Sequence, residues 1–152
     1  MSNLKAYFKC ARDSDIESII KIMRDGYYKC WDKKFFKSLI KNRNSIIYIL
    51  ENSEGVLGFV AANHSGTECD IIMLMVDIKK RRSGFGSMLI QNILLLFKDR
   101  GITNVYLEVA QNNIAAIRLY EKYGFKKIHI RKSYYKFGDT MIDAGLYAMV
   151  NI

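Results

Sequence analysis

The chain has 152 residues, of which half are apolar and about a quarter are charged, so we expect one domain over residues 1–152. No apolar run approaches the roughly 20 residues of a membrane-spanning helix, and three scattered cysteines without a CxxC pair argue against a zinc site or a disulfide framework. We therefore expect no metal, no membrane and a cytoplasmic protein. The formal net charge of +9 fits either a solvated basic surface or an anionic ligand. No nucleic-acid-binding motif accompanies it, so stable binding of nucleic acid is not expected.

Capping and turn residues divide the first half of the chain into short elements. Ser14 and Glu17 form a capping-box pattern, and Gly26 ends the helix that follows. Asp32 is suited to cap a second helix, and the segment 52–55 is a hairpin signal between two β-rich runs. The elements that we expect here are a strand over 4–10, helices over 14–26 and 32–41, and strands over 46–51 and 56–63.

The second half of the chain alternates strands with helices. The run over 71–76 is almost continuously apolar, which favours a strand buried on both faces. A loop over 77–86 leads into an apolar helix over 85–100, which Gly101 ends. We then expect a strand over 104–109, a helix capped by Asn113 that ends near 123–124, and strands over 125–131 and 141–150. The order β-α-α-β-β-β-α-β-α-β-β predicts an α/β fold, in which a mixed sheet carries helices on both faces.

A glycine loop joins the buried strand to the apolar helix. The segment 81–86 reads Arg-Arg-Ser-Gly-Phe-Gly, and its glycines let the backbone approach a ligand closely. The N–H groups at the start of the next helix favour an anion, and the basic run over 79–82 supplies countercharge. The loop is neither a Walker A loop, since no GK[ST] follows, nor a dinucleotide fingerprint, since Leu89 replaces the third glycine. By itself it fits either a phosphate site or a helix start that needs a tight turn.

A glutamate and a tyrosine stand out downstream of this loop. Alternation along 104–110 places Glu108 on the face opposite Leu107 and Val109, where a carboxylate either faces solvent or is functional. Asn113 and Tyr120 lie along one face of the next helix, where Tyr120 is either a core residue or a functional one. The sequence pattern leaves both alternatives open for each residue.

Taken together, these segments resemble the GNAT superfamily of N-acetyltransferases. The loop over 81–86 matches the superfamily's [RQ]-x-x-G-x-[GA] pattern, and 113–125 matches N-x-x-A-x-x-L-Y-x-x-x-G-F. Within the superfamily the chain is most similar to the RimI family of ribosomal-protein-alanine acetyltransferases, because 131–149 follows its R-x-x-Y-Y…D-A…M ending. Ile78 and Cys30 stand where that family usually has prolines.

The resemblance implies a GNAT-like fold with two splayed central strands that receive acetyl-coenzyme A as cosubstrate, and direct attack of the acceptor amine on the thioester. By the resemblance Glu108 is the general base, Tyr120 is the acid that protonates the leaving thiolate, and the Val76 N–H stabilises the oxyanion. The residues that the resemblance places against the cofactor are Met75, Val76, Arg81, Arg82, Ser83, Gly84, Phe85, Gly86, Asn113 and Tyr120.

The resemblance also implies an acceptor, a peptide or protein N-terminus bound in a groove with aromatic side chains. The candidates for this groove are Trp31, Tyr134 and Tyr135, each of which could instead belong to the core. A polyamine or antibiotic acceptor is the first alternative, for which Glu68 and Asp70 are the acidic residues at hand. A module that binds acetyl-coenzyme A without chemistry is the second alternative. We expect a monomer or a weak homodimer.

Overall fold

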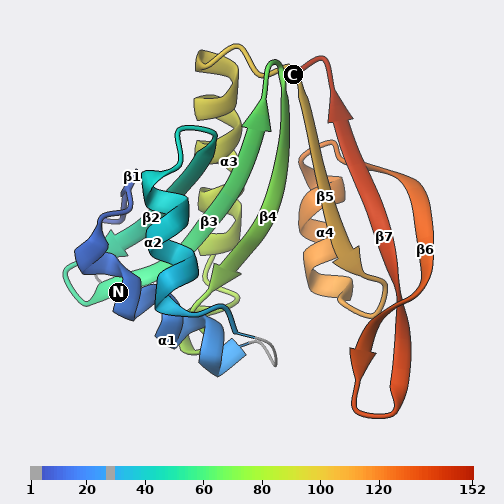
Figure 1. Ribbon diagram of the computed structural model, residues 1–152, viewed down its shortest axis with the longest axis horizontal. Coiled ribbons are helices and arrows are strands. Elements are labelled where there is room, and N and C mark those ends of the chain that lie inside the picture. Colours follow the sequence, from blue (N-terminus) through green and yellow to red (C-terminus); the bar gives the residue numbers. More distant parts are fainter. Residues whose placement is uncertain (1–4, 27–29) are drawn as a thin grey trace.

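A seven-stranded mixed sheet with helices on both faces forms the fold in the computed structural model, which describes residues 5–26 and 30–152 (Figure 1). The strand order is β1-β2-β3-β4-β5-β7-β6, in which only the β4–β5 pair is parallel. The strands are β1 (Tyr7–Cys10), β2 (Ser45–Asn52), β3 (Gly55–Ser65), β4 (Glu68–Val76), β5 (Asn104–Ala110), β6 (Lys126–Phe137) and β7 (Thr140–Val150). The helices are α1 (Ile16–Gly26), α2 (Lys33–Lys41), α3 (Phe85–Asp99) and α4 (Ile114–Lys122), with short 3-10 turns at Asp13–Asp15 and Ile78–Lys80.

Local capping chemistry explains three of the helix ends, and the order of the elements is the predicted one. The Asp32 carboxylate accepts the Phe35 N–H at 2.8 Å at the start of α2, and the Asn113 side chain accepts the Ala116 N–H at 3.2 Å at the start of α4. Gly101 follows α3 with a φ of 74°, a conformation that glycine adopts without strain.

Three details differ from the sequence-based expectation. The first strand begins at Tyr7 instead of residue 4, which lies outside the described residues. The expected capping box at Ser14 is wrong, because the Arg12 N–H donates to Asp15 and a 3-10 turn precedes α1. The last hairpin is longer than expected, since β6 continues past Arg131 to Phe137.

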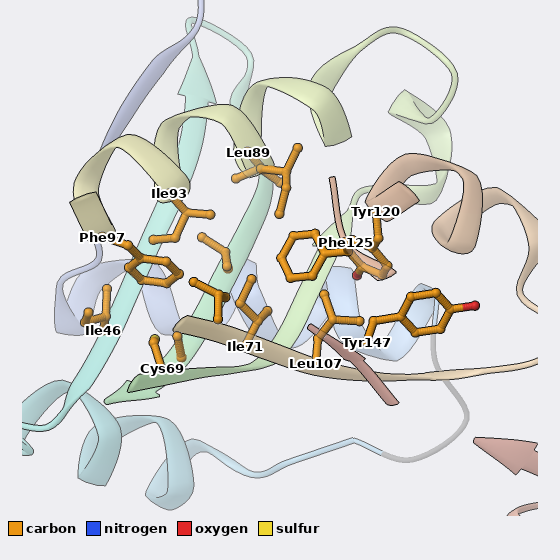
Figure 2. Close-up of a cluster of buried hydrophobic side chains, with 14 of the residues drawn as sticks. Ile46, Cys69, Ile71, Leu89, Ile93, Phe97, Leu107, Tyr120, Phe125 and Tyr147 are labelled. Atoms are coloured by element: carbon orange, nitrogen blue, oxygen red, sulfur yellow. The ribbon is translucent and has the colours of Figure 1, made fainter. Parts of the chain in front are cut away.

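Each face of the sheet has its own buried cluster. On the face that carries α3 and α4, Leu89, Ile93 and Phe97 of α3 pack against β-strand side chains such as Val105 and Leu107 (Figure 2). The other cluster lies between the sheet and the α1–α2 pair. Burial of these apolar side chains, each contributing about 1.5–3 kcal/mol, fixes the sheet between its two helical layers.

The parallel strands β4 and β5 separate halfway along their length, which confirms the expected splay. They pair only from Glu68–Asn104 to Ile71–Leu107, and both strands then continue without each other (Figure 1). A bulge places Ile72 as an extra residue of β4 opposite the Ala61–Ala62 step of β3. Bulges bend a strand, so this one turns β4 away from β5 where their pairing ends.

Candidate active site

The diverging ends of β4 and β5 leave backbone groups directed into the opening between them. The Asp77 N–H donates to the Leu57 carbonyl of β3 at 2.8 Å, so Asp77 faces β3. Backbone groups alternate direction along a strand, and Leu74 and Val76 therefore turn their N–H and C=O groups toward the opening. The backbone of Met75 is directed at β3 instead, and its side chain is buried under α1 and α2. An extended polar ligand in the opening would thus meet the edge of β4 at two alternate residues.

The loop that follows β4 presents a row of N–H groups at the start of α3. Gly84 caps α3 with a φ of 84°, and Arg82 adopts a φ of 60°, which is unusual for a residue with a side chain. The first backbone hydrogen bond of the helix runs from the Met88 N–H to the Gly84 carbonyl at 3.1 Å. Within the part of the chain that the structure describes, the N–H groups over 82–87 donate to no backbone carbonyl. Such N–H groups, together with the dipole of a 15-residue helix, bind an anion.

The two loop arginines have different surroundings. The Arg81 Nε donates to the Val76 carbonyl at 3.3 Å, and a Cβ built on Gly26 would lie 2.6 Å from the Arg81 guanidinium. The Arg81 side chain therefore crosses the end of α1 and links the loop to the end of β4. Arg82 and Ser83 are exposed, as a phosphate-binding pair would need to be. Gly86 packs tightly, because a Cβ there would lie 3.2 Å from the Leu119 side chain of α4.

Tyr120 lies on the α3–α4 face of the sheet. It is 7% exposed, and its ring meets the ring of Phe125 edge-on, with centroids 5.8 Å apart (Figure 2). Burial raises the pKa of the Tyr120 phenol to about 12, because the phenolate would lose its hydration. The Tyr120 phenol is therefore neutral at physiological pH. Asn113 lies at the start of the same helix and caps it through its side-chain oxygen.

Glu108 lies on the opposite face of the sheet. Leu107 and Val109 point into the α3–α4 cluster, so alternation turns Glu108 toward the other face, where it is partly exposed. Its carboxylate lies 3.2 Å from the Arg131 guanidinium of β6. The predicted base and the predicted acid thus flank the β4–β5 opening from opposite sides of the sheet.

The three aromatic residues predicted for the acceptor groove occupy two places. Trp31 is half-buried against Phe35, with ring centroids 4.5 Å apart, and lines an open depression of about 460 Å³ at the start of α2. Tyr134 is exposed and Tyr135 is half-buried, and their rings meet edge-on at 5.0 Å. Tyr135 pairs with Ile142 and Arg131 with Ala144, so register places Tyr135 on the same face as Arg131.

The acidic pair considered for a polyamine lies on the paired part of β4, outside the opening. Glu68 and Asp70 are on the part of β4 that pairs with β5, before the strands separate. Burial, and then the neighbouring charge of Glu68, raise the pKa of Asp70. Among the described residues no cluster of metal-ligating side chains occurs, and no helix is long and apolar enough to cross a membrane.

Sequence patterns did not identify two residues near the opening. Arg131 contacts Glu108 although 22 intervening positions separate them, and no spacing rule relates them. Gln111 follows β5 and has a buried amide nitrogen without a hydrogen-bond partner among the described residues, while its oxygen lies 3.4 Å from the Lys127 amine. The sequence signal available for Gln111 was its place as a polar residue directly after the strand over 104–110.

Comparison with known proteins agrees with this geometry. The model of the acetyltransferase (GNAT) family matches residues 16–125. The ribosomal protein bS18-alanine N-acetyltransferase of Escherichia coli (strain K12) is 28% identical over 136 residues, which cover 90% of this chain and 91% of that protein. The N-alpha-acetyltransferase of Sulfurisphaera tokodaii is 29% identical over 142 residues, which cover 85% of each protein.

The fold comparison gives the same result. The crystal structure of the ribosomal-protein-S18-alanine N-acetyltransferase from Escherichia coli has a TM-score of 0.90 and 25% sequence identity to this chain. The match covers 97% of this chain and 94% of the other. The chain is therefore similar in sequence and in fold, over nearly its whole length, to proteins named as N-acetyltransferases.

Proposed function

The chain belongs to the acetyltransferase (GNAT) family and is an N-acetyltransferase, and we propose that it acetylates the α-amino group of a protein N-terminus. The first candidate acceptor is the N-terminal alanine of a ribosomal protein. The observation that carries the proposal is the β4–β5 opening, with Glu108 on one face of the sheet and the neutral Tyr120 on the other. We expect the enzyme to act in the cytoplasm as a monomer or weak homodimer, without stable nucleic acid binding.

The residues around the opening fit acetyl-coenzyme A, which supplies an activated acetyl thioester when it is bound. The unpaired N–H groups over 82–86 and the Arg82 side chain suit its diphosphate. The outward-turned edge of β4 at Leu74 and Val76 suits the amides of its pantetheine arm, as in strand addition. The Val76 N–H would then stabilise the oxyanion, an effect worth about 3 kcal/mol at comparable sites.

Tyr120 would serve as the general acid because it holds its proton throughout the physiological range. A phenol with a pKa of about 12 is a weak acid, so its proton moves only to a base of similar strength. Cys69 shows what the same cluster does to a thiol, since burial there raises its pKa to about 12. Burial of a released thiolate would likewise raise its pKa, which favours proton transfer from Tyr120.

Glu108 would serve as the general base, directly or through one water molecule. A free α-amino group has a pKa of about 8, so the base removes a proton that is already weakly held. A lysine ε-amine, with a pKa of about 10.4, would ask more of the same carboxylate. The partial exposure of Glu108 on an uncovered face gives a chain terminus access to it.

The open face beside Glu108 supports a peptide acceptor over a polyamine. The carboxylates of Glu108 and Asp143 are already paired with Arg131 and Lys132, which leaves little free negative charge there for a polycation. The acidic pair Glu68 and Asp70 lies at the closed end of the β4–β5 pair and does not contribute to the opening. Trp31 at the start of α2 and Tyr135 on β6 are available to line a shallow groove for an extended chain.

The test is release of free thiol from acetyl-coenzyme A with a panel of acceptors. The panel contains short peptides that differ in their first residue, an N-terminally blocked peptide with one lysine, and spermidine. We expect turnover with free N-termini, strongest with alanine or another small first residue, and none with the blocked peptide. Turnover with spermidine alone would refute the acceptor, and cofactor binding without turnover on any acceptor would support the non-catalytic alternative.

A further inference from the structure

The Glu108 carboxylate has one charged partner, and that partner comes from the edge of the sheet. The Arg131 Nη1 lies 3.2 Å from Glu108 Oε1, and the two side chains are 49% and 25% exposed. In the part of the chain that the structure describes, no other ion pair involves Glu108. The orientation of the proposed base therefore depends on this contact.

The register of the sheet shows how Arg131 reaches Glu108. Glu108 is opposite Leu146 of β7, and Arg131 is opposite Ala144 of the same strand, so the two charged residues lie on one face with β7 between them. Two strand spacings separate them by roughly 10 Å, a distance that two long side chains cover when they extend toward each other. The small side chain of Ala144, which is fully buried, leaves room for the guanidinium to cross β7.

A bulge in β6 directly after Arg131 holds this side chain in place. The pairing of β6 with β7 is interrupted between Arg131 and Tyr135, and Ser133 there adopts a φ of 50°. The Ser133 N–H donates to Asp143 of β7 at 2.8 Å, and the Lys132 amine lies 3.4 Å from the other oxygen of that carboxylate. Both carboxylate oxygens of Asp143 therefore connect the bulge to β7.

The same bulge puts an aromatic ring against the arginine. The guanidinium carbon of Arg131 lies 5.4 Å from the centroid of the Tyr134 ring, which is within cation–π range. Arg131 therefore has two contacts, the ring of Tyr134 and the carboxylate of Glu108. The turn at Ser133, the Asp143 carboxylate of β7 and the Tyr134 ring hold this part of β6. Together they place the Arg131 guanidinium beside the proposed base.

We propose that Arg131 is a positioning residue that holds the Glu108 carboxylate in one orientation on the face of the sheet from which the acceptor approaches, and that the β6 bulge sets the place of Arg131. The proposal rests on the proposed role of Glu108 as base. A glutamate on an open strand face samples several rotamers, and a base must lie within hydrogen-bond reach of the proton that it removes. The contact with Arg131 selects the rotamer in which the Glu108 carboxylate extends toward β7, on the side of β5 away from β4, and Arg131 would act on the acceptor only through Glu108.

The test is a double-mutant cycle measured as kcat and as KM for each substrate. Arg131→Met keeps the aliphatic stem over Tyr134 and should lower kcat about 10-fold, since small misplacement of a reacting group has large kinetic effects. The KM for acetyl-coenzyme A should stay within about twofold, and Arg131→Lys should recover part of kcat. In a Glu108→Gln background, Arg131→Met should cause no further loss. The control is Lys126→Met, which removes a positive charge from the same face of β6 at the start of the strand. It should leave kcat and both KM values unchanged.

The outcomes separate the two proposals. Full turnover of Glu108→Gln would show that the base assignment is wrong, whatever Arg131 does. A slow Glu108→Gln with a fully active Arg131→Met would overturn the positioning role alone, as would losses that simply multiply in the double variant. A rise in kcat of Arg131→Met would also overturn it, because the ion pair would then be holding the base away from the acceptor. Thermal unfolding of each variant shows whether a loss comes from misfolding.

Discussion

Tyr120→Phe should separate chemistry from folding at the centre of the site. The substitution keeps the buried ring and its edge-on contact with Phe125, and it removes only the hydroxyl. Loss of that hydroxyl costs at most the net value of one hydrogen bond, about 0.5–1.5 kcal/mol, whereas truncation to alanine would cost about 3–5 kcal/mol. We therefore expect a melting temperature within about 5 °C of the wild type.

The kinetic effect of Tyr120→Phe should be large. With a pKa of about 12 the phenol is ionised in only about one molecule in 10⁵ at pH 7, so the hydroxyl is present to donate in almost every enzyme molecule. Removing a general acid lowers turnover by about 10²-fold, equivalent to about 2.7 kcal/mol of transition-state stabilisation. The assay is steady-state thiol release with the preferred peptide, together with calorimetric titration of acetyl-coenzyme A, whose affinity should change less than about threefold.

The matched control is Tyr147→Phe. Tyr147 is 1% exposed in the same cluster, and its hydroxyl points in a different direction from that of Tyr120 (Figure 2). The Tyr147→Phe variant should keep wild-type turnover. Wild-type turnover of Tyr120→Phe itself, or an equal loss in both variants, would refute the assignment of Tyr120 as the acid.

Three further predictions concern the loop, the thiols and the bulge. Arg82→Ala should weaken acetyl-coenzyme A binding about 10-fold in calorimetry with little change in kcat, since Arg82 is exposed beside the unpaired amides; unchanged affinity would exclude it from the phosphate site. At pH 8 a thiol reagent should modify exposed Cys10 and Cys30 rapidly but Cys69 only after unfolding, because burial raises the pKa of Cys69 to about 12; three fast thiols would contradict this. The hydrogen bond from the bulge N–H lowers the pKa of Asp143, so its stabilisation of the bulge is complete above about pH 5 and lost as pH falls below 3.8. The protection factor of the Ser133 amide, which corrects for the pH dependence of intrinsic exchange, should fall over that acid range, and a protection factor that does not follow this transition would count against this role of Asp143.

Local chemistry made most of the fold predictable from the sequence. The caps at Asp32 and Asn113 and the stop at Gly101 depend on residues within three positions, and all three are found as expected. The capping box at Ser14 failed because Asp15 competes for the same role and binds the Arg12 N–H. Where two polar residues near a helix start can both cap, local pattern does not decide between them.

The candidate site was predictable only where strand alternation or helix spacing sufficed. Alternation placed Glu108 on the face away from the α3–α4 cluster, and helix spacing put Asn113 and Tyr120 along one face of a helix without deciding whether Tyr120 is a core residue. The contact between Glu108 and Arg131 depends on β7 lying between β5 and β6, and on a bulge closed by Asp143, ten residues after Ser133. Neither the strand order nor a bulge fixed from the neighbouring strand can be derived from the local sequence, so the positioning residue emerged only from the structure.

The placement of the two proposed catalytic groups favours direct transfer over a covalent acyl-enzyme. In the proposed mechanism, an amine that loses its proton to Glu108 would approach from one face of the sheet, and a thiolate that takes a proton from Tyr120 would leave toward the other face. Attack and departure on opposite sides of one carbonyl need both substrates to be bound at once. The buried Cys69 cannot act as an acyl carrier instead, because its raised pKa keeps it protonated and it lies on the paired part of β4, before the opening begins. In this mechanism, the bend of β4 at Ile72 would also give the acceptor and the leaving group separate routes to the same bond.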